Sequence, residues 1–284
     1  MGTVSRLLRS AGLKAPKQRK TKPRPPATDA NINEAVAYTA SVFATYDGLF
    51  RERGIAVEGR ALLEIGPGGD FGLQLLMVDR GASVTVADRF LSEWDEDYHP
   101  RFYRAFLSRV GRSPSVERVL DQSGYHGVID LVSAPAEDLR AIPDRTFDVV
   151  VSNAVLEHLY DPGVAAREMR RVSKAGAVHS HQVDFRDHRD FARPLEHLLL
   201  SRRAFSRLSA RKNCEFGCQT RPLELARIFA KAGYAVDGSE VSENADEGYL
   251  DDLIPRLRRT WLSPYKRWKR DDLRTIGVRY WMRA

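Results

Sequence analysis

The sequence predicts an α/β fold with a doubly wound, mostly parallel seven-stranded sheet and helical cap insertions. Short apolar runs of strand length alternate with helix-length segments along most of the chain, which is typical of a sheet covered by helices on both faces. The first of these runs leads directly into a glycine-rich turn. The chain has 284 residues, of which 43% are hydrophobic, and this is enough for one large domain with additions.

The first half of the folded region is predicted to open with a helix. Residues 31–53 carry an imperfect helical stripe of apolar side chains. The elements that follow are strands at 61–65, 83–87, 128–132 and 147–151, a helix that ends near residue 79, and a mixed helical region at 91–121.

The second half continues the alternation and adds two long connections. The elements expected there are a helix at 161–173, a strand at 177–183, a helix at 222–233 that closes at Gly233, and strands at 234–241 and 275–282. The connections at about 185–221 and 242–274 are too long for simple loops. Because insertions of this length in compact domains usually form lids or binding loops, we expect both to form helical caps.

The positive charge of the chain is concentrated in its N-terminal tail. The net charge is +7, and residues 1–27 contain eight Lys or Arg, four prolines and no acid, so the remainder is close to neutral. Residues 1–30 are therefore predicted to be a disordered basic tail, and residues 31–284 the folded domain. Such a tail is either solvated or weakly attracted to an anionic membrane surface. A nucleic-acid partner is disfavoured, because the neutral body has little charge to attract phosphates.

Cysteine content and hydropathy bear on the compartment. No apolar run approaches the roughly 20 residues that cross a bilayer. The only cysteines, Cys214 and Cys218, provide no disulfide framework, which favours a reducing compartment. We expect a cytoplasmic protein.

A glycine-rich loop follows the first predicted strand and precedes a helix. It reads Glu64-Ile-Gly-Pro-Gly-Gly-Asp-Phe-Gly72, and its glycines allow a sharp turn and the close approach of a ligand. Asp88 ends the second strand, 22 residues after Gly66, where an acidic side chain can accept hydrogen bonds from both hydroxyls of an adenosine ribose. The two features together predict a nucleoside-containing ligand.

Three details favour S-adenosylmethionine (SAM) over a dinucleotide. Phe71 occupies the position of the third glycine in the dinucleotide fingerprint. Glu64 would repel a pyrophosphate but suits a ligand that carries an ammonium and a sulfonium. Pro67 lacks the N–H group that a phosphate cradle would use.

Ordered motifs over residues 61–183 resemble those of the class I SAM-dependent methyltransferases, in particular the broad methyltransferase type 11 group. The resemblance rests on Leu62-Leu-Glu-Ile-Gly-Pro-Gly-Gly, Val86-Ala-Asp88, Ala136-Glu-Asp-Leu139, and Phe147-Asp-Val-Val-Val-Ser-Asn-Ala-Val-Leu-Glu-His158. It implies a Rossmann-like fold and SAM as the cofactor.

The resemblance also implies roles for particular residues. Gly66 and Gly68 would lie under the methionine part of SAM, and Asp88 would bind the ribose. Pro135 stands where many members have Asp, so Glu137 is expected to take over part of the adenine contact. The full set of expected cofactor-binding residues is Glu64, Gly66, Gly68, Asp88, Ala136, Glu137 and Asn153.

Histidines and acids follow the fourth and fifth strands, and they are the candidates for catalysis. A hydroxyl or amine acceptor must lose a proton, and imidazole is the side chain best suited to take it near neutral pH. The candidates are His188, His158, Asp184 and His181. His188 is preferred to His181 because it should be more exposed.

Two of these assignments have plainer alternatives. His158 can be a packing residue of the fold, and residues 184–189 can be a loop held by ion pairs to Arg186 and Arg189. Asp184, Asp187 and His188 have donor atoms for a divalent ion, but hydrogen bonding is the commoner use of such groups, so no metal is predicted.

The insertions are expected to determine specificity. Aromatic residues and arginines in 185–221 fit either a pocket for an anionic acceptor or an ordinary helical cap. The residues concerned are Phe185, Phe191, His197, Phe205 and Phe216, with Arg193, Arg202, Arg203 and Arg221.

The predicted activity is SAM-dependent methylation, by O-methylation, of a small-molecule, sugar or lipid-linked glycan acceptor. The segment Asp184-Phe-Arg-Asp-His188 resembles methyltransferases of bacterial surface-polysaccharide synthesis. RNA or protein methylation is an alternative, opposed by the neutral body and by Ser152-Asn-Ala-Val in the place of a motif for planar-nitrogen acceptors. A non-catalytic SAM-binding module is the third alternative.

Overall fold

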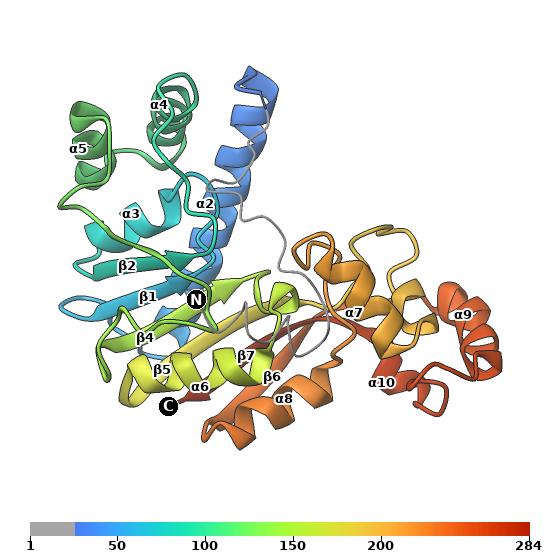
Figure 1. Ribbon diagram of the computed structural model, residues 1–284. Coiled ribbons are helices and arrows are strands. Elements are labelled where there is room, and N and C mark those ends of the chain that lie inside the picture. Colours follow the sequence, from blue (N-terminus) through green and yellow to red (C-terminus); the bar gives the residue numbers. More distant parts are fainter. Residues whose placement is uncertain (1–25) are drawn as a thin grey trace. The chain divides into compact units, whose positions relative to one another are not determined.

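The computed structural model describes residues 26–284, so nearly all of the predicted basic tail, with its expected membrane contact, lies outside the described residues (Figure 1). The chain divides into two units. The N-terminal unit consists of residues 26–135 and Thr146–Val151, and the C-terminal unit of Ala136–Arg145 and Ser152–Ala284. A seven-stranded sheet has the strand order β3-β2-β1-β4-β5-β7-β6, and this confirms the predicted fold class.

The N-terminal unit contains the alternating elements that the sequence predicts. They are α2 (Asp29–Glu52), β1 (Ala61–Ile65), α3 (Gly72–Asp79), β2 (Ser83–Asp88), α4 (Tyr98–Val110), α5 (Pro114–Gln122), β3 (Asp130–Ser133) and most of β4 (Phe147–Asn153). Strands β1, β2 and β3 pair in parallel. Parallel pairing places their carboxyl ends, and the loops that follow, at one edge of the sheet.

Two differences from the predicted elements of this unit have a clear local cause. The helical region at 91–121 is two helices, because Gly111 has a φ of 84° and Pro114 starts a new helix capped by Ser113. The third strand begins at Asp130 rather than at residue 128. The backbone N–H groups of Val128 and Ile129 are already bonded to the Tyr125 carbonyl in a turn.

The C-terminal unit contains the remaining strands and the caps. Its elements are η1 (Leu156–His158), α6 (Pro162–Val172), β5 (Ser173–Asp184), η2 (Glu196–Leu199), α7 (Arg202–Ala210), α8 (Pro222–Lys231), β6 (Ala235–Asn244), α9 (Glu247–Arg259), α10 (Arg270–Arg274) and β7 (Thr275–Arg283). Strand β7 pairs antiparallel with both β5 and β6. The fifth strand runs over Ser173–Asp184 and is therefore longer than the predicted 177–183, mainly at its start.

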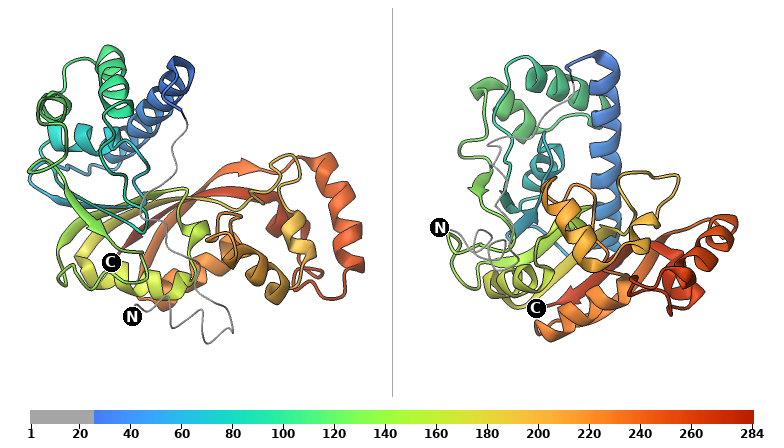
Figure 2. Two further views of the ribbon diagram at one scale, coloured as in Figure 1. Left: turned by 45° about the horizontal axis from the view of Figure 1, so that its top comes forward. Right: turned by 45° about the vertical axis from the view of Figure 1, so that its right-hand side comes forward.

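The two insertions, although separated in the sequence, share one apolar core. Leu195 and Leu198 from the first insertion pack with Leu250, Leu253 and Leu257 from the second. Figure 2 shows the helices of both insertions beside one another at one end of this unit. They therefore form a single cap, which the sequence alone predicted only as two separate segments.

None of the helices in residues 26–284 combines the length and the apolar character needed to span a membrane.

Candidate active site

The glycine loop of the N-terminal unit owes its shape to two glycines with positive φ. Gly66 has a φ of 68°, and its N–H donates to the Ala87 carbonyl at 2.9 Å, which ties the loop to the end of β2. Gly68 has a φ of 88°, and a Cβ built on it meets no atom within 4 Å. The backbone at Gly68 therefore requires glycine for its conformation, and it faces open space that a ligand can approach.

Glu64, at the end of β1, is held rigidly beneath this loop. Its side chain is buried, and the Gln74 amide on α3 donates to its Oε2 at 2.6 Å and to the Pro67 carbonyl at 3.4 Å. Gln74 thus fixes both the acid and the loop. Sequence reasoning missed this residue, because no local pattern distinguishes it from the other residues of the helix.

Phe71 and Asp88 complete the cofactor region of this unit. Phe71, in the third-glycine position, has a φ of 52° and packs its buried ring 4.7 Å from that of Tyr125. Asp88 is partly exposed at the end of β2, and its Oδ1 accepts a hydrogen bond from the N–H of Phe90 at 2.8 Å. The carboxylate is oriented by its own turn, as a ribose-binding acid requires.

The C-terminal unit holds the other expected cofactor residues. Ala136 is buried, and Asn153 ends β4 in a half-buried position. Glu137 is 1% exposed, and its Oε1 accepts hydrogen bonds from the N–H groups of Tyr160 and Asp161 at 2.7 and 3.4 Å. Glu137 is therefore a core residue that shapes the 159–161 turn, and its carboxylate is not presented to a cofactor as the sequence prediction required.

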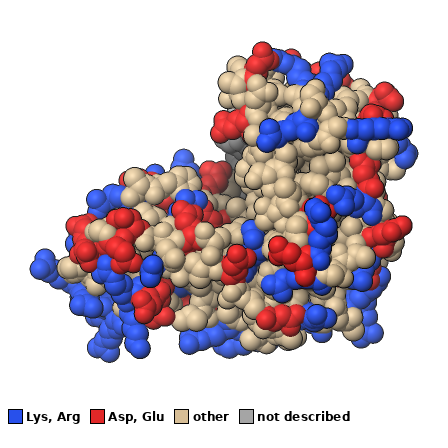
Figure 3. Space-filling model, turned by 180° about the vertical axis from the view of Figure 1, so that it is seen from behind, with Lys and Arg blue, Asp and Glu red and all other residues tan. Residues whose placement is uncertain are grey.

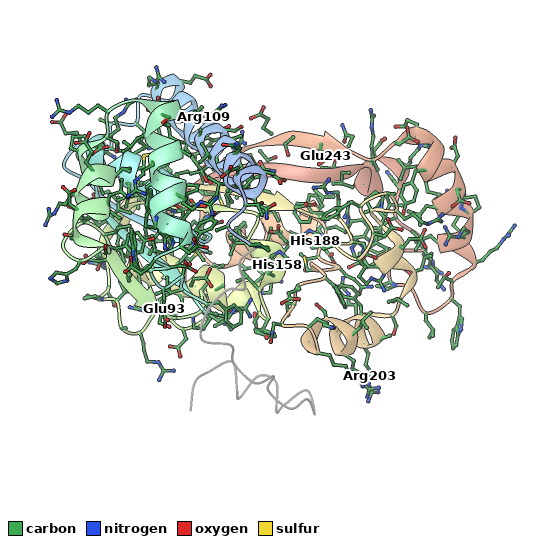
Figure 4. The ribbon with its side chains drawn as sticks, turned by 90° about the horizontal axis from the view of Figure 1, so that it is seen from above. Glu93, Arg109, His158, His188, Arg203 and Glu243 are labelled. Carbon is green, nitrogen blue, oxygen red and sulfur yellow. The ribbon has the colours of Figure 1, made fainter. Side chains whose placement is uncertain are left out.

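Glu157, His158 and His188 form a group that we call the histidine cluster. Each offers one ligand-type atom, and these atoms all lie within 4.8 Å of one another. The rings of His158 and His188 meet edge to face, with centroids 4.9 Å apart (Figure 4). Glu157 and His158 come from η1 and His188 from the loop after β5. The two segments are joined where the Ala154 N–H donates to the Gln182 carbonyl at 3.0 Å.

Both histidines are oriented by partners outside the cluster. The Nδ1–H of His158 donates to the Cys214 carbonyl at 2.7 Å, and Nε2 of His188 lies 3.4 Å from Oδ2 of Asp184. The backbone N–H of His188 donates to the Phe216 carbonyl at 3.4 Å. The segment 214–217 therefore holds the His158 ring and the His188 backbone, whereas sequence reasoning had considered it only for Cys214 and Phe216.

Asp184 is charged because its neighbours stabilise the carboxylate. Burial alone would raise its pKa, but the His188 imidazole and the Arg186 guanidinium, 2.7 Å away, outweigh burial and hold the pKa well below its usual range. The ion pair with Arg186 is the loop arrangement considered from the sequence. It coexists with the contact to His188.

The carboxyl group of Glu157 has different surroundings from that of Asp184. Its side chain has no exposed surface, and neither carboxylate oxygen has a hydrogen-bond partner among the described residues. Burial raises the pKa of Glu157 well above its ordinary value; the nearby backbone N–H groups of Glu157 and Asp184 oppose this only in part, and the negative charge of Asp184 adds to it. An uncompensated buried carboxyl of this kind is costly to the fold.

His181 lies in the core, away from the cluster. It is fully buried and stacks on Phe229, and its Nδ1 shares a 2.8 Å hydrogen bond with Ser152. His179 is on the same face, as predicted, with its Nδ1 3.2 Å from Nε2 of His181. Burial lowers the pKa of His181 to about 3. His181 is thus a neutral structural histidine, which removes it from the candidates for the base.

Asp187 is removed from the possible metal donors. It is 1% exposed, and both its oxygens are engaged by Arg189. The metal set considered from the sequence, which joined Asp187 to Asp184 and His188, is therefore not the set of donors that the fold brings together.

Most of the cap residues that were candidates for an acceptor pocket have structural roles. Arg221 is fully buried and donates to the Phe185, Leu273 and Thr275 carbonyls. Arg193 and Arg202 are ion-paired to Glu196 and Glu224, and the side chains of Phe185, His197 and Phe205 are buried. Phe191 differs: it is 56% exposed, and its ring lies 5.2 Å from that of His188.

Residues 97–180 match the family model described as a methyltransferase domain. No curated protein matches the chain.

Similar solved structures have low sequence identity to the chain. One is a SAM-dependent methyltransferase from Mesorhizobium loti (15% identity, 81% of this chain and 93% of that chain, TM-score 0.48). Another is a putative sarcosine dimethylglycine methyltransferase from Galdieria sulphuraria (12%, 99% and 96%, 0.47). A third is phosphoethanolamine N-methyltransferase 2 from Haemonchus contortus in complex with SAM (14%, 80% and 49%, 0.44).

Proposed function

We propose that this chain is a class I SAM-dependent methyltransferase and that it transfers the methyl group to a hydroxyl oxygen of a small-molecule, sugar or lipid-linked glycan acceptor. The observation that carries the proposal is the pairing of a partly exposed histidine with a charged carboxylate, His188 with Asp184, at the end of β5. The acceptor hydroxyl loses its proton at the histidine cluster, and His188 is the group on which that step depends.

The residues of the glycine loop fit the proposed cofactor contacts. SAM carries an electrophilic methyl group on a sulfonium, and it supplies the reacting carbon when it is bound. The buried carboxylate of Glu64 suits the positive charges of the methionine part, and open space faces Gly68. The oriented carboxylate of Asp88 suits the ribose hydroxyls.

The chemistry of an alcohol acceptor explains why a histidine is needed. The bond from sulfur to the methyl carbon breaks, the bond from the acceptor oxygen to that carbon forms, and S-adenosylhomocysteine leaves. The hydroxyl proton must go to a base, and an imidazole beside a carboxylate takes it because the carboxylate orients the ring and stabilises the imidazolium. Asp184, held in its charged form by Arg186, is the positioning residue.

Phe191 supports a sugar among the acceptor classes. Its exposed ring lies beside His188 and beneath the Arg186 guanidinium, whose carbon is 4.7 Å from the ring centroid. An exposed aromatic face next to a base can stack against the apolar face of a sugar ring while the hydroxyl points to the histidine.

The cap supports the lipid-linked form of that acceptor. Residues 256–270 contain seven Lys or Arg and no acid, and they include Trp261 and Leu262, which are 77% and 56% exposed. Figure 3 shows Lys and Arg gathered at the lower left of that view, at the end of the C-terminal unit that carries the cap. Exposed Trp and Leu flanked by cations suit an anionic membrane surface, where a lipid-linked glycan would be presented to a cytoplasmic enzyme.

The proposal is tested by measuring transfer of radiolabelled methyl from SAM to a panel of acceptors. The panel holds free sugars, nucleotide sugars, lipid-linked oligosaccharides in anionic vesicles, transfer RNA and unfolded protein. We expect label in the glycan fractions, and most of it in the lipid-linked fraction. Label only in RNA or protein would overturn the acceptor assignment, and SAM binding without transfer to any member would indicate a binding module.

A further inference from the structure

We infer that Glu157, His158 and His188 form a binding site for one divalent transition-metal ion of the zinc type, which coordinates the acceptor oxygen. The ion's role rests on the proposed function, because it activates the acceptor hydroxyl. Binding of the ion does not rest on it, since it follows from the geometry of the three side chains.

The first argument is the convergence of three donors from two segments. Their ligand atoms lie within 4.8 Å of one another, and the His158 and His188 rings are in contact (Figure 4). Two ligands at about 2.1 Å from one ion lie up to about 4.2 Å apart. Small side-chain rotations would therefore bring all three atoms to bonding distance without movement of the backbone.

The second argument is that Glu157 has no other partner. Its carboxylate has no exposed surface, and neither oxygen accepts a hydrogen bond of normal geometry from a described residue, although backbone N–H groups of Glu157 and Asp184 lie near it. The charged groups near it are Asp184, which repels it, and Arg186, which is already bonded to Asp184. A cation between Glu157 and the two histidines would satisfy this buried carboxylate.

The third argument is the arrangement behind each histidine. Metal-binding histidines almost always donate their second ring N–H to a carbonyl or a carboxylate, which fixes the tautomer and the ring orientation. His158 donates its Nδ1–H to the Cys214 carbonyl, so Nε2 is the nitrogen with the lone pair. His188 has the carboxylate of Asp184 beside it. Both kinds of supporting partner are thus present, one for each ring.

The donor set selects the kind of ion. Two imidazole nitrogens and one carboxylate oxygen suit zinc, iron(II) and related ions, whereas magnesium and calcium prefer sites made of oxygen atoms alone. Three protein ligands leave a coordination position open, as in catalytic zinc sites. An acceptor hydroxyl in that position would become more acidic, and its oxygen would be directed by the ion. With the ion bound, His188 would be a ligand in place of the free base described above, and the hydroxyl proton would go to solvent.

Isothermal titration calorimetry with Zn²⁺ tests the site, on full-length protein freed of metal by a chelator that is then removed. We expect one ion per chain, with the affinity lowered at least tenfold by Glu157→Gln and by His158→Asn. The controls are His126→Gln, a surface histidine of the other unit, and Cys218→Ser, which removes a thiol near the site. Neither control should change the affinity.

Cobalt(II) provides a second readout that is independent of activity. Its visible absorption reports the coordination number, and added acceptor should change it by occupying the open position. Thermal unfolding of each variant shows whether a loss of binding is a loss of folding; His188→Gln is the additional variant should Glu157→Gln fail to fold. Absence of stoichiometric binding, or equal binding by wild type and all three ligand variants, would overturn the site.

The two proposals fail in different ways. Hydroxyl methylation by a protein that binds no ion would leave the function intact with His188 as a free base, and it would reject the metal site. Tight binding of one ion by a protein that methylates only RNA or protein would reject the proposed acceptor and retain the site.

Discussion

The glycine loop and the histidine cluster each form a candidate site at the ends of strands, but one is built from the backbone of a single segment and the other from side chains of separate segments. The loop is built from consecutive residues whose backbone is turned by positive φ values at Gly66 and Gly68. The cluster is built from side chains that are about 30 residues apart in the chain, and a third segment, 214–217, holds the His158 ring and the His188 backbone through its carbonyls. The loop therefore appears in the sequence as a contiguous motif, whereas the cluster appears only when the segments are folded together.

The largest expected effect separates the roles of the two regions. His188→Gln should lower kcat by about 100- to 10,000-fold, the usual contribution of a positioned proton acceptor, while SAM affinity stays unchanged. The measurement is steady-state transfer together with calorimetry of SAM binding, with His126→Gln as the matched control. An equal loss of SAM affinity would mean that the cluster belongs to the cofactor site.

The next effect concerns the stability of the C-terminal unit. Arg221→Met removes a buried cation that donates to three carbonyls, and it should cost about 3 kcal/mol of unfolding free energy, because the carbonyls are left without a donor. Chemical denaturation measures this. Arg203→Met, on an exposed residue of the same cap, should change the unfolding free energy by less than about 0.5 kcal/mol. Equal effects would contradict the assignment of Arg221 to the core of the cap.

A substitution at the predicted ribose-binding acid of the N-terminal unit should change the affinity for the cofactor. Asp88→Ala should weaken SAM binding by about 1–3 kcal/mol, through the loss of charge-assisted hydrogen bonds to the ribose. Calorimetry of SAM and S-adenosylhomocysteine measures the change, and Glu93→Ala, on the loop that follows β2, is the control. Unchanged affinity in Asp88→Ala would show that the ribose lies elsewhere.

The smallest effect is a pH dependence. The folded-state pKa of Asp184 is depressed, so the stability it contributes is present above its ordinary pKa near 4 and is lost as the pH falls below that value. Replacement by Asn should make the loss of unfolding free energy between pH 5 and pH 2 smaller by on the order of 1 kcal/mol. Thermal unfolding across this range measures it. An unchanged slope would mean that Asp184 is not stabilised by Arg186 and His188 in solution.

The fold was largely predictable because its signals are local. Strand-length apolar runs gave β1, β2, β4 and β5 to within a few residues, and the glycine loop fixed the start of α3. The split of the 91–121 helical region and the late start of β3 were not predicted, because they depend on turns at Gly111 and around Tyr125. The spacing of apolar residues does not reveal such turns.

The candidate site was less predictable because burial decides the role of each titratable group. The sequence alone does not distinguish the role of His181 from that of His188. In the structure, His181 is stacked on Phe229 in the core, whereas His188 is partly exposed. Glu157 entered the sequence analysis only as the neighbour of His158, because nothing local shows that it is buried without a partner. Gln74 was missed for the same reason.

The central claim is that the chain methylates an oxygen and that the histidine cluster is required for it. Its most direct test is the carbon-13 spectrum of the product formed from SAM labelled with carbon-13 in the methyl group. The predicted result is an O-methyl ether of a glycan acceptor with the wild-type protein and at least about 100-fold slower formation of that product with His188→Gln. An N-methyl product, or an O-methyl product formed equally well by His188→Gln, would contradict the claim.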